Sequence, residues 1–268
     1  MMLDEQTILA AAARLHMAER TRKPIRQFTL EYPGITIDDA YAIQQAWVKQ
    51  KISEGRVVKG RKIGLTSRTM QAALNINEPD YGTLLDDMFY RDGEEIPVDR
   101  FISPRVEVEL AFVLGKRLTG PGCTIFDVFN ATDFVVPAME ILDSRLQRID
   151  PETKQTRKIM DTISDNAGNA ALVLGGQPLR PFDTDMRWVS ALCFRNGQIE
   201  ESGVAAAVLN HPANGIAWLT NKLAQHGVAL EPRQVILSGS FIRPVEARKG
   251  DTFHADYGSF GCVSCYFG

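Results

Sequence analysis

Two glutamates, Glu107 and Glu109, stand one residue apart in the apolar stretch RVEVELAFVL, which spans residues 105–114. Successive side chains of a β-strand point to opposite faces, so these two carboxylates would share one face, about 7 Å apart along the strand. Two carboxylates at this spacing can converge on one cation. A solvated polar face on an edge sheet would produce the same pattern, so the stretch alone leaves both interpretations open.

A third acid, Glu140, follows the apolar run FVVPAM at residues 134–139. We expect this strand to be buried on both faces, where an unpaired carboxylate would cost on the order of several kcal/mol. Glu140 therefore needs a positive partner. Three carboxylates on two strands, with water completing the coordination, suit Mg²⁺ and also Mn²⁺. The alternative is an ion pair between Glu140 and Arg105 or Lys62.

The histidines and cysteines do not indicate a zinc or redox centre. The four histidines show none of the spacings that are typical of zinc sites, and the pair Cys262 and Cys265 has no second cysteine pair to complete a site. Since the N-terminus does not have the charge order of an export signal, we expect four free thiols in a reducing cytoplasm.

Lys62 and Asp80 are the candidate acid/base groups. Lys62 lies between Gly60 and Gly64, which allow a ligand or another backbone to come close. Burial beside a bound cation should lower the pKa of Lys62 toward neutrality, where an amine can exchange protons; an ordinary solvated lysine is the alternative. Asp80 lies in EPDYG, which we interpret as a turn that either holds an acid/base group over a site or lies at the surface.

Two serine-containing segments could bind the carboxylate of a ligand. The segments SDN at 164–166 and SGSF at 238–241 offer hydroxyl and backbone N–H donors, although capping and turn formation use the same residues. Just before the first segment, residues 143–165 are rich in charge and poor in large apolar side chains. We expect this stretch to be either a lid over a pocket or a plain solvated loop.

The remaining pattern predicts an α+β fold with flanking helices around a mixed or antiparallel β-sheet. A small helical N-terminal lobe, residues 1–56, would pack on a catalytic body of residues 57–268. No predicted strand is followed by GxGxxG or GxxxxGK[ST], which argues against a nucleotide-binding fold. Helices are predicted at 8–19, 36–48 with Thr36 as the cap, and 213–225, and strands at 57–65, 106–114, 134–142, 171–174, 188–195, 235–237 and 262–267.

The composition excludes several functional classes. The 268 residues carry a net charge of −3, with 30 basic and 33 acidic side chains interspersed, so we expect no nucleic-acid partner and no binding to a membrane surface. No apolar run approaches the length that crosses a bilayer. A hydrophobic content of 44% is enough for one substantial core without disulfides.

Seven short motifs in a fixed order resemble the hydratase/decarboxylase branch of the fumarylacetoacetate hydrolase superfamily. Each motif alone is a weak signal, whereas all seven in this order, from about Thr36 to the C-terminus, are specific. Glu140, where many hydrolase relatives carry Asp, favours this branch, as does the absence of an evident histidine base. The motifs are KIGLTS (62–67), EPDYG (78–82), EVE (107–109), PAME (137–140), DTISDNA (161–167), GSF (239–241) and KGDT (249–252).

The resemblance implies an enzyme with a divalent-metal site at Glu107, Glu109 and Glu140. Mg²⁺ would be the cofactor, with Mn²⁺ as an alternative. A 2-oxo acid can offer two oxygens to such an ion, which stabilises the negative charge that develops when its double bond shifts. Lys62 and Asp80 would then move the protons, in an order that the sequence does not assign.

The resemblance also implies a 2-oxo dicarboxylate substrate, bound by Leu65, Ser164 and Ser240. The N-terminal third and LNHPANG at 209–215 are most similar to hydratases of a seven-carbon 2-oxo-4-enedioate in homoprotocatechuate meta-cleavage. A 2-oxo-3-enedioate decarboxylase or a 2-oxopent-4-enoate hydratase is the alternative. Members of the family are cytoplasmic homo-oligomers. The distal carboxylate of a dioate also needs an arginine, for which the candidates are Arg105, Arg145 and Arg243.

Overall fold

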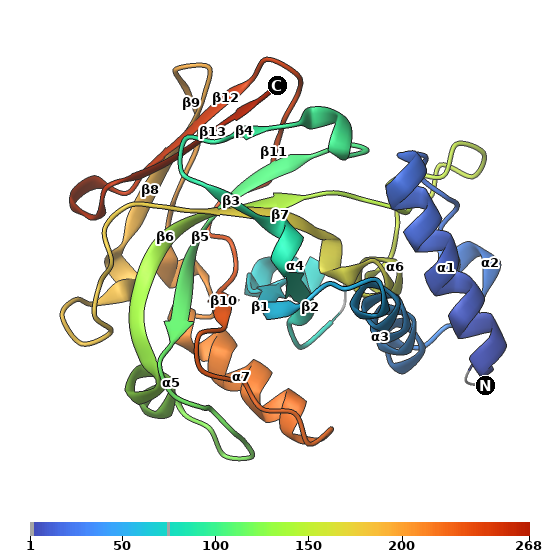
Figure 1. The fold of residues 1–268 in the computed structure, drawn as a ribbon, viewed down its shortest axis with the longest axis horizontal. Coiled ribbons are helices and arrows are strands. Elements are labelled where there is room, and N and C mark those ends of the chain that lie inside the picture. The colour runs from blue at the N-terminus through green and yellow to red at the C-terminus, as the bar shows by residue number, and fades with distance from the viewer. Residues whose placement is uncertain (1–2, 74–75) are drawn as a thin grey trace.

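The larger of two β-sheets has eight strands and forms the centre of the molecule (Figure 1). A computed structural model describes residues 3–73 and 76–268. The strands run in the order β2-β1-β10-β5-β6-β7-β3, and β11 pairs with β5. They are β1 (Val58–Gly64), β2 (Asp80–Leu85), β3 (Phe89–Arg91), β5 (Arg105–Leu114), β6 (Thr132–Leu142), β7 (Asn169–Leu174), β10 (Val235–Leu237) and β11 (Val245–Glu246).

The smaller sheet has five strands in the order β4-β13-β12-β8-β9. Parallel and antiparallel pairs occur in both sheets, so the predicted mixed α+β body is confirmed. The strands are β4 (Glu95–Ile96), β8 (Ser190–Arg195), β9 (Gln198–Val204), β12 (Thr252–Asp256) and β13 (Cys262–Phe267).

Helices α1 to α3 lie on one side of the molecule, and α5 and α7 lie together below the sheets in Figure 1. The predicted cap on α3 is confirmed, because Thr36 and Asp39 form a capping box at its start. The helices are α1 (Glu5–Thr21), α2 (Phe28–Glu31), α3 (Ile37–Ser53), α4 (Arg68–Ala73), α5 (Ile125–Ala131), α6 (Ile159–Ser164) and α7 (Pro212–Ala224).

Strand β5 separates two apolar cores. Every second side chain of β5, from Val106 to Leu114, packs against α7 and the smaller sheet. On the other face, Ala111 and Val113 pack in a core that includes residues of α1 and α3. Glu107 and Glu109 belong to this second face, since the faces alternate along the strand. The N-terminal helices therefore share a core with the sheet face that carries the acids, and the division into residues 1–56 and 57–268 stays a prediction.

The segment that contains Asp80 differs from the sequence-based expectation. Asp80 is not in a surface turn; it is the buried first residue of β2, which pairs antiparallel with β1. The proline and glycine of EPDYG suggested a turn, but the turn ends at Pro79 and all six residues of the following strand are buried. Strand pairing thus overrides the local turn signal.

Only the middle of the polar stretch 143–165 is a solvated loop, since residues 151–156 are exposed and the residues on either side are largely buried. Asp143, Ser144 and Arg145 are buried, and the stretch runs into helix α6. Arg145 forms an ion pair with Asp165, and it also donates to the carbonyl oxygens of Asp165 at 2.6 Å and Asn169 at 3.0 Å. These charges pair with one another inside the protein, which the composition of the stretch could not reveal. The lid interpretation stays a prediction.

Among the residues that the structure describes, we find no helix with the length and apolarity needed to cross a membrane.

The ion pair of Arg145 and Asp165 gives a stability prediction. Arg145→Met should lower the free energy of unfolding by about 3–5 kcal/mol, because it leaves a buried carboxylate without its partner. Urea unfolding followed by circular dichroism measures this loss. Arg187→Met, which removes an exposed ion pair with Asp185, should leave stability almost unchanged and serves as the control. Equal effects of the two substitutions would contradict the structural role of Arg145.

Candidate active site

Glu107, Glu109 and Glu140 lie together on one face of the larger sheet. β5 and β6 pair so that Glu107 is directly opposite Glu140, and Glu109 follows on the same face of β5. One carboxylate oxygen of each glutamate lies within 4.8 Å of the other two. Glu109 and Glu140 are buried, whereas Glu107 is partly exposed. The strand pairing therefore brings the three acids to one point, with Glu107 nearest to solvent.

Burial and mutual repulsion make these acids difficult to ionise together. Burial raises the pKa of Glu107 to about 8, helped by the charge of Glu140 and opposed by that of Lys62. Burial and Glu140 also raise the pKa of Glu109 well above its ordinary range. Like charges in a poorly solvated site disfavour each other's ionised forms. If all three were ionised, they would carry more negative charge than Lys62 neutralises.

Lys62, in the middle of β1, is the positive partner of Glu140. Its buried Nζ lies 3.3 Å from Oε1 of Glu140 and donates to the carbonyl oxygen of Ala167 at 3.1 Å. Burial would lower the pKa of Lys62, but the charges of Glu140, Asp80 and the other two glutamates outweigh it and raise the pKa above its ordinary value. These carboxylates act without a bound cation, so the lowered pKa that we expect beside one stays a prediction.

Asp80 and Lys62 approach each other across a glycine. Asp80 is paired with Gly64 in the sheet, and a Cβ atom on Gly64 would lie 2.2 Å from Oδ1 of Asp80 and 3.2 Å from Nζ of Lys62. Burial raises the pKa of Asp80 to about 6, although the charge of Lys62 acts against this rise. Gly64 therefore leaves the space in which a buried acid and a buried amine stand close together, as its position beside Lys62 in the sequence indicates.

Three further residues hold the carboxylates in place, and none of them was predicted to contact a glutamate. Asn169 donates from Nδ2 to Oε1 of Glu140 at 2.8 Å, and the backbone N–H of Gly239 donates to Oε2 of Glu109 at 2.8 Å. The hydroxyl of Tyr257 donates to the carbonyl oxygen of Ala138 at 2.6 Å and accepts from the N–H of Glu109 at 3.2 Å. Gly239 lies in the GSF motif, but no local pattern marks Asn169 or Tyr257.

The three residues that we expect to bind substrate have different surroundings. Ser164 ends α6, and its buried hydroxyl has no hydrogen-bond partner among the described residues. Leu65 directly follows β1 in the left-handed backbone region, with φ of 54°. The Ser240 hydroxyl donates to the carbonyl of Ile242 at 3.0 Å, so it takes part in a turn. The contact of all three with substrate stays a prediction.

The donor set of the three glutamates fits a hard divalent cation. Oε2 of Glu140 is buried without a hydrogen-bond partner, and all the donor atoms are oxygens. Such sets suit Mg²⁺, Mn²⁺ or Ca²⁺, whereas zinc sites draw on histidine and cysteine. In the described part of the chain, no other group of three or more His, Cys, Asp or Glu side chains lies close enough to share an ion.

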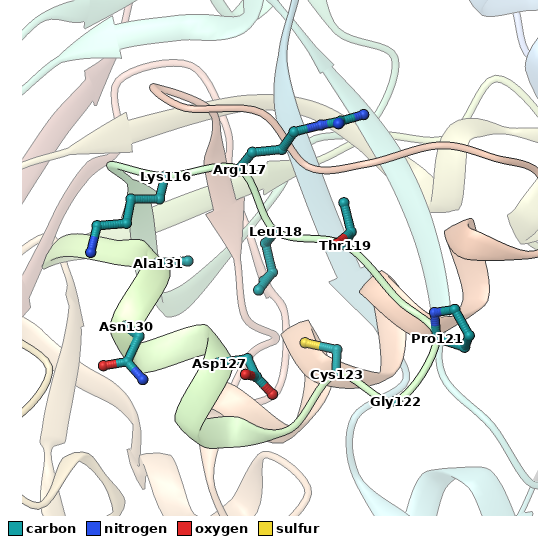
Figure 2. Close-up of a pocket in the computed structure, with 10 residues that line it drawn as sticks. All are labelled: Lys116, Arg117, Leu118, Thr119, Pro121, Gly122, Cys123, Asp127, Asn130 and Ala131. Atoms are coloured by element: carbon teal, nitrogen blue, oxygen red, sulfur yellow. The ribbon is translucent and has the colours of Figure 1, made fainter.

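A separate cavity lies beyond the far end of β5. It has a volume of about 350 Å³ and is bordered by the loop 116–123 and by helix α5. Figure 2 shows Lys116 on the loop side of this cavity and Asp127 on the helix. Lys116 comes seven residues after Glu109, about 20 Å along an extended chain, and none of the three glutamates borders the cavity. This cavity is therefore distinct from the carboxylate site.

Comparison of the sequence with known families and proteins gives matches along almost the whole chain. Residues 59–267 match the family model described as fumarylacetoacetate (FAA) hydrolase C-terminal. The 2-oxo-hept-4-ene-1,7-dioate hydratase of Escherichia coli is 63% identical, over 99% of this chain and 100% of the relative. The 2-keto-4-pentenoate hydratase of Paraburkholderia xenovorans LB400 is 38% identical, over 96% of this chain and 93% of the relative.

A solved structure with the same architecture contains a divalent metal. The 4-oxalocrotonate decarboxylase from Pseudomonas putida G7, complexed with magnesium and adipate, superposes with a TM-score of 0.93 at 32% identity. The match covers 99% of this chain and 98% of that one.

The raised pKa of Glu107 predicts how stability depends on pH. A carboxyl whose pKa rises from 4.5 to about 8 on folding holds its proton more tightly in the folded chain, so the fold loses stability as pH rises through this interval. In EDTA, urea unfolding should give a lower free energy at about pH 8.5 than at about pH 6. Glu107→Gln should reduce this difference, because it removes one titrating group.

Glu246→Gln, which alters an exposed glutamate, should keep the pH dependence of the unsubstituted protein. An undiminished pH dependence in Glu107→Gln would show that the pKa of Glu107 is not raised in the folded protein.

Proposed function

The chain belongs to the fumarylacetoacetate hydrolase family, and we propose that it is a divalent-metal-dependent hydratase of 2-oxo-hept-4-ene-1,7-dioate. The product would be 4-hydroxy-2-oxoheptanedioate. The observation that carries this proposal is the meeting of Glu107, Glu109 and Glu140 at one point, in contact with Lys62. The choice of substrate rests on the similarity to the Escherichia coli hydratase along the whole chain.

Glu107, Glu109 and Glu140 are the proposed metal ligands, and Mg²⁺ is the proposed ion, with Mn²⁺ as the alternative. The unpartnered oxygen of Glu140, the all-oxygen donor set and the magnesium in the related decarboxylase structure support this choice. Asn169 and the N–H of Gly239 would keep two of the carboxylates oriented, since each already donates to one of their oxygens.

Lys62 and Asp80 are the proposed proton carriers. A divalent ion in this site would draw electron density from the two oxygens of a 2-oxo acid. Ala167 and Glu140 fix Nζ of Lys62, and Asp80 lies on the other side of Gly64. With a pKa of about 6, Asp80 can both give and accept a proton near neutrality.

The proposed reaction consumes one water and needs no oxidant. A proton leaves C3 and another is added at C5, which moves the double bond into conjugation with the 2-oxo group. Water then adds its oxygen at C4 and one proton at C3. One of the pair Lys62 and Asp80 would carry the proton between C3 and C5, and the other would take the proton from water. Leu65, Ser164 and Ser240 are the proposed substrate contacts, and the unpartnered hydroxyl of Ser164 supports its part.

Two other reactions of the same family are the alternatives. A 2-oxo-3-enedioate decarboxylase could use the same ion and the same 2-oxo acid grip, and the likeness to the Pseudomonas putida decarboxylase favours it. A 2-oxopent-4-enoate hydratase would differ in the length of the substrate, and the Paraburkholderia relative favours that possibility.

The cellular setting follows from the same proposal. The enzyme would act on a small-molecule 2-oxo dicarboxylate in homoprotocatechuate meta-cleavage, as a cytoplasmic homo-oligomer. Its family resemblance supports both the location and the assembly.

The first functional prediction concerns the product. Purified protein with Mg²⁺ should convert 2-oxo-hept-4-ene-1,7-dioate to the 4-hydroxy product without release of CO₂, as followed by NMR. Glu109→Gln should lower the rate by more than about 10²-fold and abolish the rise in Tm on addition of Mg²⁺, because it removes a ligand oxygen. Glu231→Gln, which alters an exposed glutamate paired with Arg117, should retain both properties. Release of CO₂ without a hydroxylated product would instead assign the protein to the decarboxylases.

The second functional prediction separates proton transfer from metal binding. Lys62→Met should lower kcat by about 10²-fold or more, because it removes an acid/base group. It should keep the rise in Tm on addition of Mg²⁺, since the ligand oxygens remain. Lys59→Met, an exposed lysine of the same strand, is the matched control. A normal kcat in Lys62→Met would dismiss its role in proton transfer.

A further inference from the structure

Three arginines lie at the strand ends next to the glutamates, and we call Arg105, Arg148 and Arg157 the arginine cluster. Arg105 is two residues before Glu107 on the same face of β5, which is about 7 Å along the strand. Arg148 donates to Oγ and the carbonyl oxygen of Ser103, just before β5 begins. Arg105 and Arg148 therefore both lie at the start of β5, next to Glu107.

Arg157 completes the cluster from the end of the neighbouring strand. Its Nη1 donates to Oγ of Ser144 at 2.7 Å, two residues after β6 ends and four after Glu140. Its backbone N–H donates to the carbonyl of Arg148 at 2.9 Å, so the two arginines lie side by side in the chain fold. Its Nη2 lies 4.0 Å from the position of a Cβ atom on Gly168, which follows the carbonyl that binds Lys62.

The arginine cluster has unused positive charge. Arg148 and Arg157 make their side-chain hydrogen bonds to neutral oxygens, and neither forms an ion pair with a carboxylate of the described residues. Of the acids nearby, Asp143 accepts two backbone N–H bonds at 2.8 Å, and Asp165 is paired with Arg145. Burial, together with the charges of Arg157 and Arg105, lowers the pKa of Arg148 to about 10. These guanidinium groups repel one another and would gain from an anion between them.

The other two arginines considered from the sequence are not available for a ligand. Arg145 is fully buried, and its guanidinium is occupied by Asp165 and the carbonyl of Asn169. The side chain of Arg243 is 86% exposed and pairs with Glu201. Only Arg105 of the three candidates lies near the glutamates, with an ion pair to the exposed Glu246 at 3.4 Å.

We propose that the arginine cluster binds the distal carboxylate of the substrate and so selects dioates over 2-oxo monocarboxylates. The inference rests on the proposed function, because it takes the 2-oxo acid end to be held at Glu107, Glu109 and Glu140. A seven-carbon chain has six carbon–carbon bonds of about 1.2 Å each along its axis, hence a length of about 7 Å, which matches the step from Glu107 to Arg105. Guanidinium groups bind carboxylates through paired hydrogen bonds, which gives both strength and orientation.

A binding experiment with unreactive analogues tests the inference. Calorimetry would measure the Kd of 2-oxoheptanedioate and of 2-oxoheptanoate for the Mg²⁺-loaded protein. Arg157→Met and Arg148→Met should each weaken binding of the dioate by about 10- to 100-fold and leave binding of the monocarboxylate within about threefold. Arg157→Lys should restore part of the loss. Arg187→Met, at an exposed arginine paired with Asp185, should change neither Kd.

The outcomes separate this inference from the proposed function. An unsubstituted protein without preference for the dioate, unchanged dioate binding in both methionine variants, or equal weakening of both ligands would overturn the arginine assignment. Retained binding of 2-oxoheptanoate shows that each variant is folded and still grips the 2-oxo acid. Selective loss of the dioate would support the cluster even if the enzyme released CO₂ from the unsaturated substrate, a result that would overturn only the hydratase proposal.

Discussion

Repulsion among three carboxylates, held within 4.8 Å of one another by strand pairing, is the constraint on which this site depends. The pairing of β5 and β6 fixes the backbone positions from which these glutamates project, so their Cα atoms cannot move apart without breaking the sheet. Lys62 neutralises part of their charge, and Asn169 and Gly239 donate hydrogen bonds to them. A site with this balance is stabilised by a cation, and folding has already met the cost of bringing its ligands together.

The same strands arrange the surroundings of the site by charge. The carboxylates lie near the ends of β5 and β6, and the arginine cluster lies just beyond those ends. A ligand with a 2-oxo acid at one end and a carboxylate at the other would lie along this gradient, from the proposed ion to the guanidinium groups. Lys62 and Asp80 lie beside the carboxylates, close to each other across Gly64. The arrangement therefore suits an elongated dianion better than a compact one.

Much of the carboxylate site could be predicted, because it depends on the alternation of side chains along a strand and on the order of the motifs. The pattern at 105–114 was sufficient to place Glu107 and Glu109 on one face, and the apolar run before Glu140 indicated a buried strand that needed a positive partner. The sequence could not show that four carboxylates raise the pKa of Lys62, because that depends on how many acids surround the amine in three dimensions. Asp80 was predicted to lie in a turn, because the strand that pairs with it contains Gly64, 16 residues earlier in the chain, and the local sequence gives no sign of this pairing.

Contacts between distant segments could not be predicted either, because they do not depend on any local sequence pattern. The stretch 143–165 has the composition of a solvated loop, yet it buries the ion pair of Arg145 and Asp165 and presents Arg148 and Arg157 at the ends of the strands. Strand β5 has two structural roles, since one face packs in the apolar core and the other carries two of the acids. A substitution that changes the size of a core side chain such as Val108 would therefore shift the strand that positions the carboxylates. Core packing and affinity for the ion thus constrain the same ten residues.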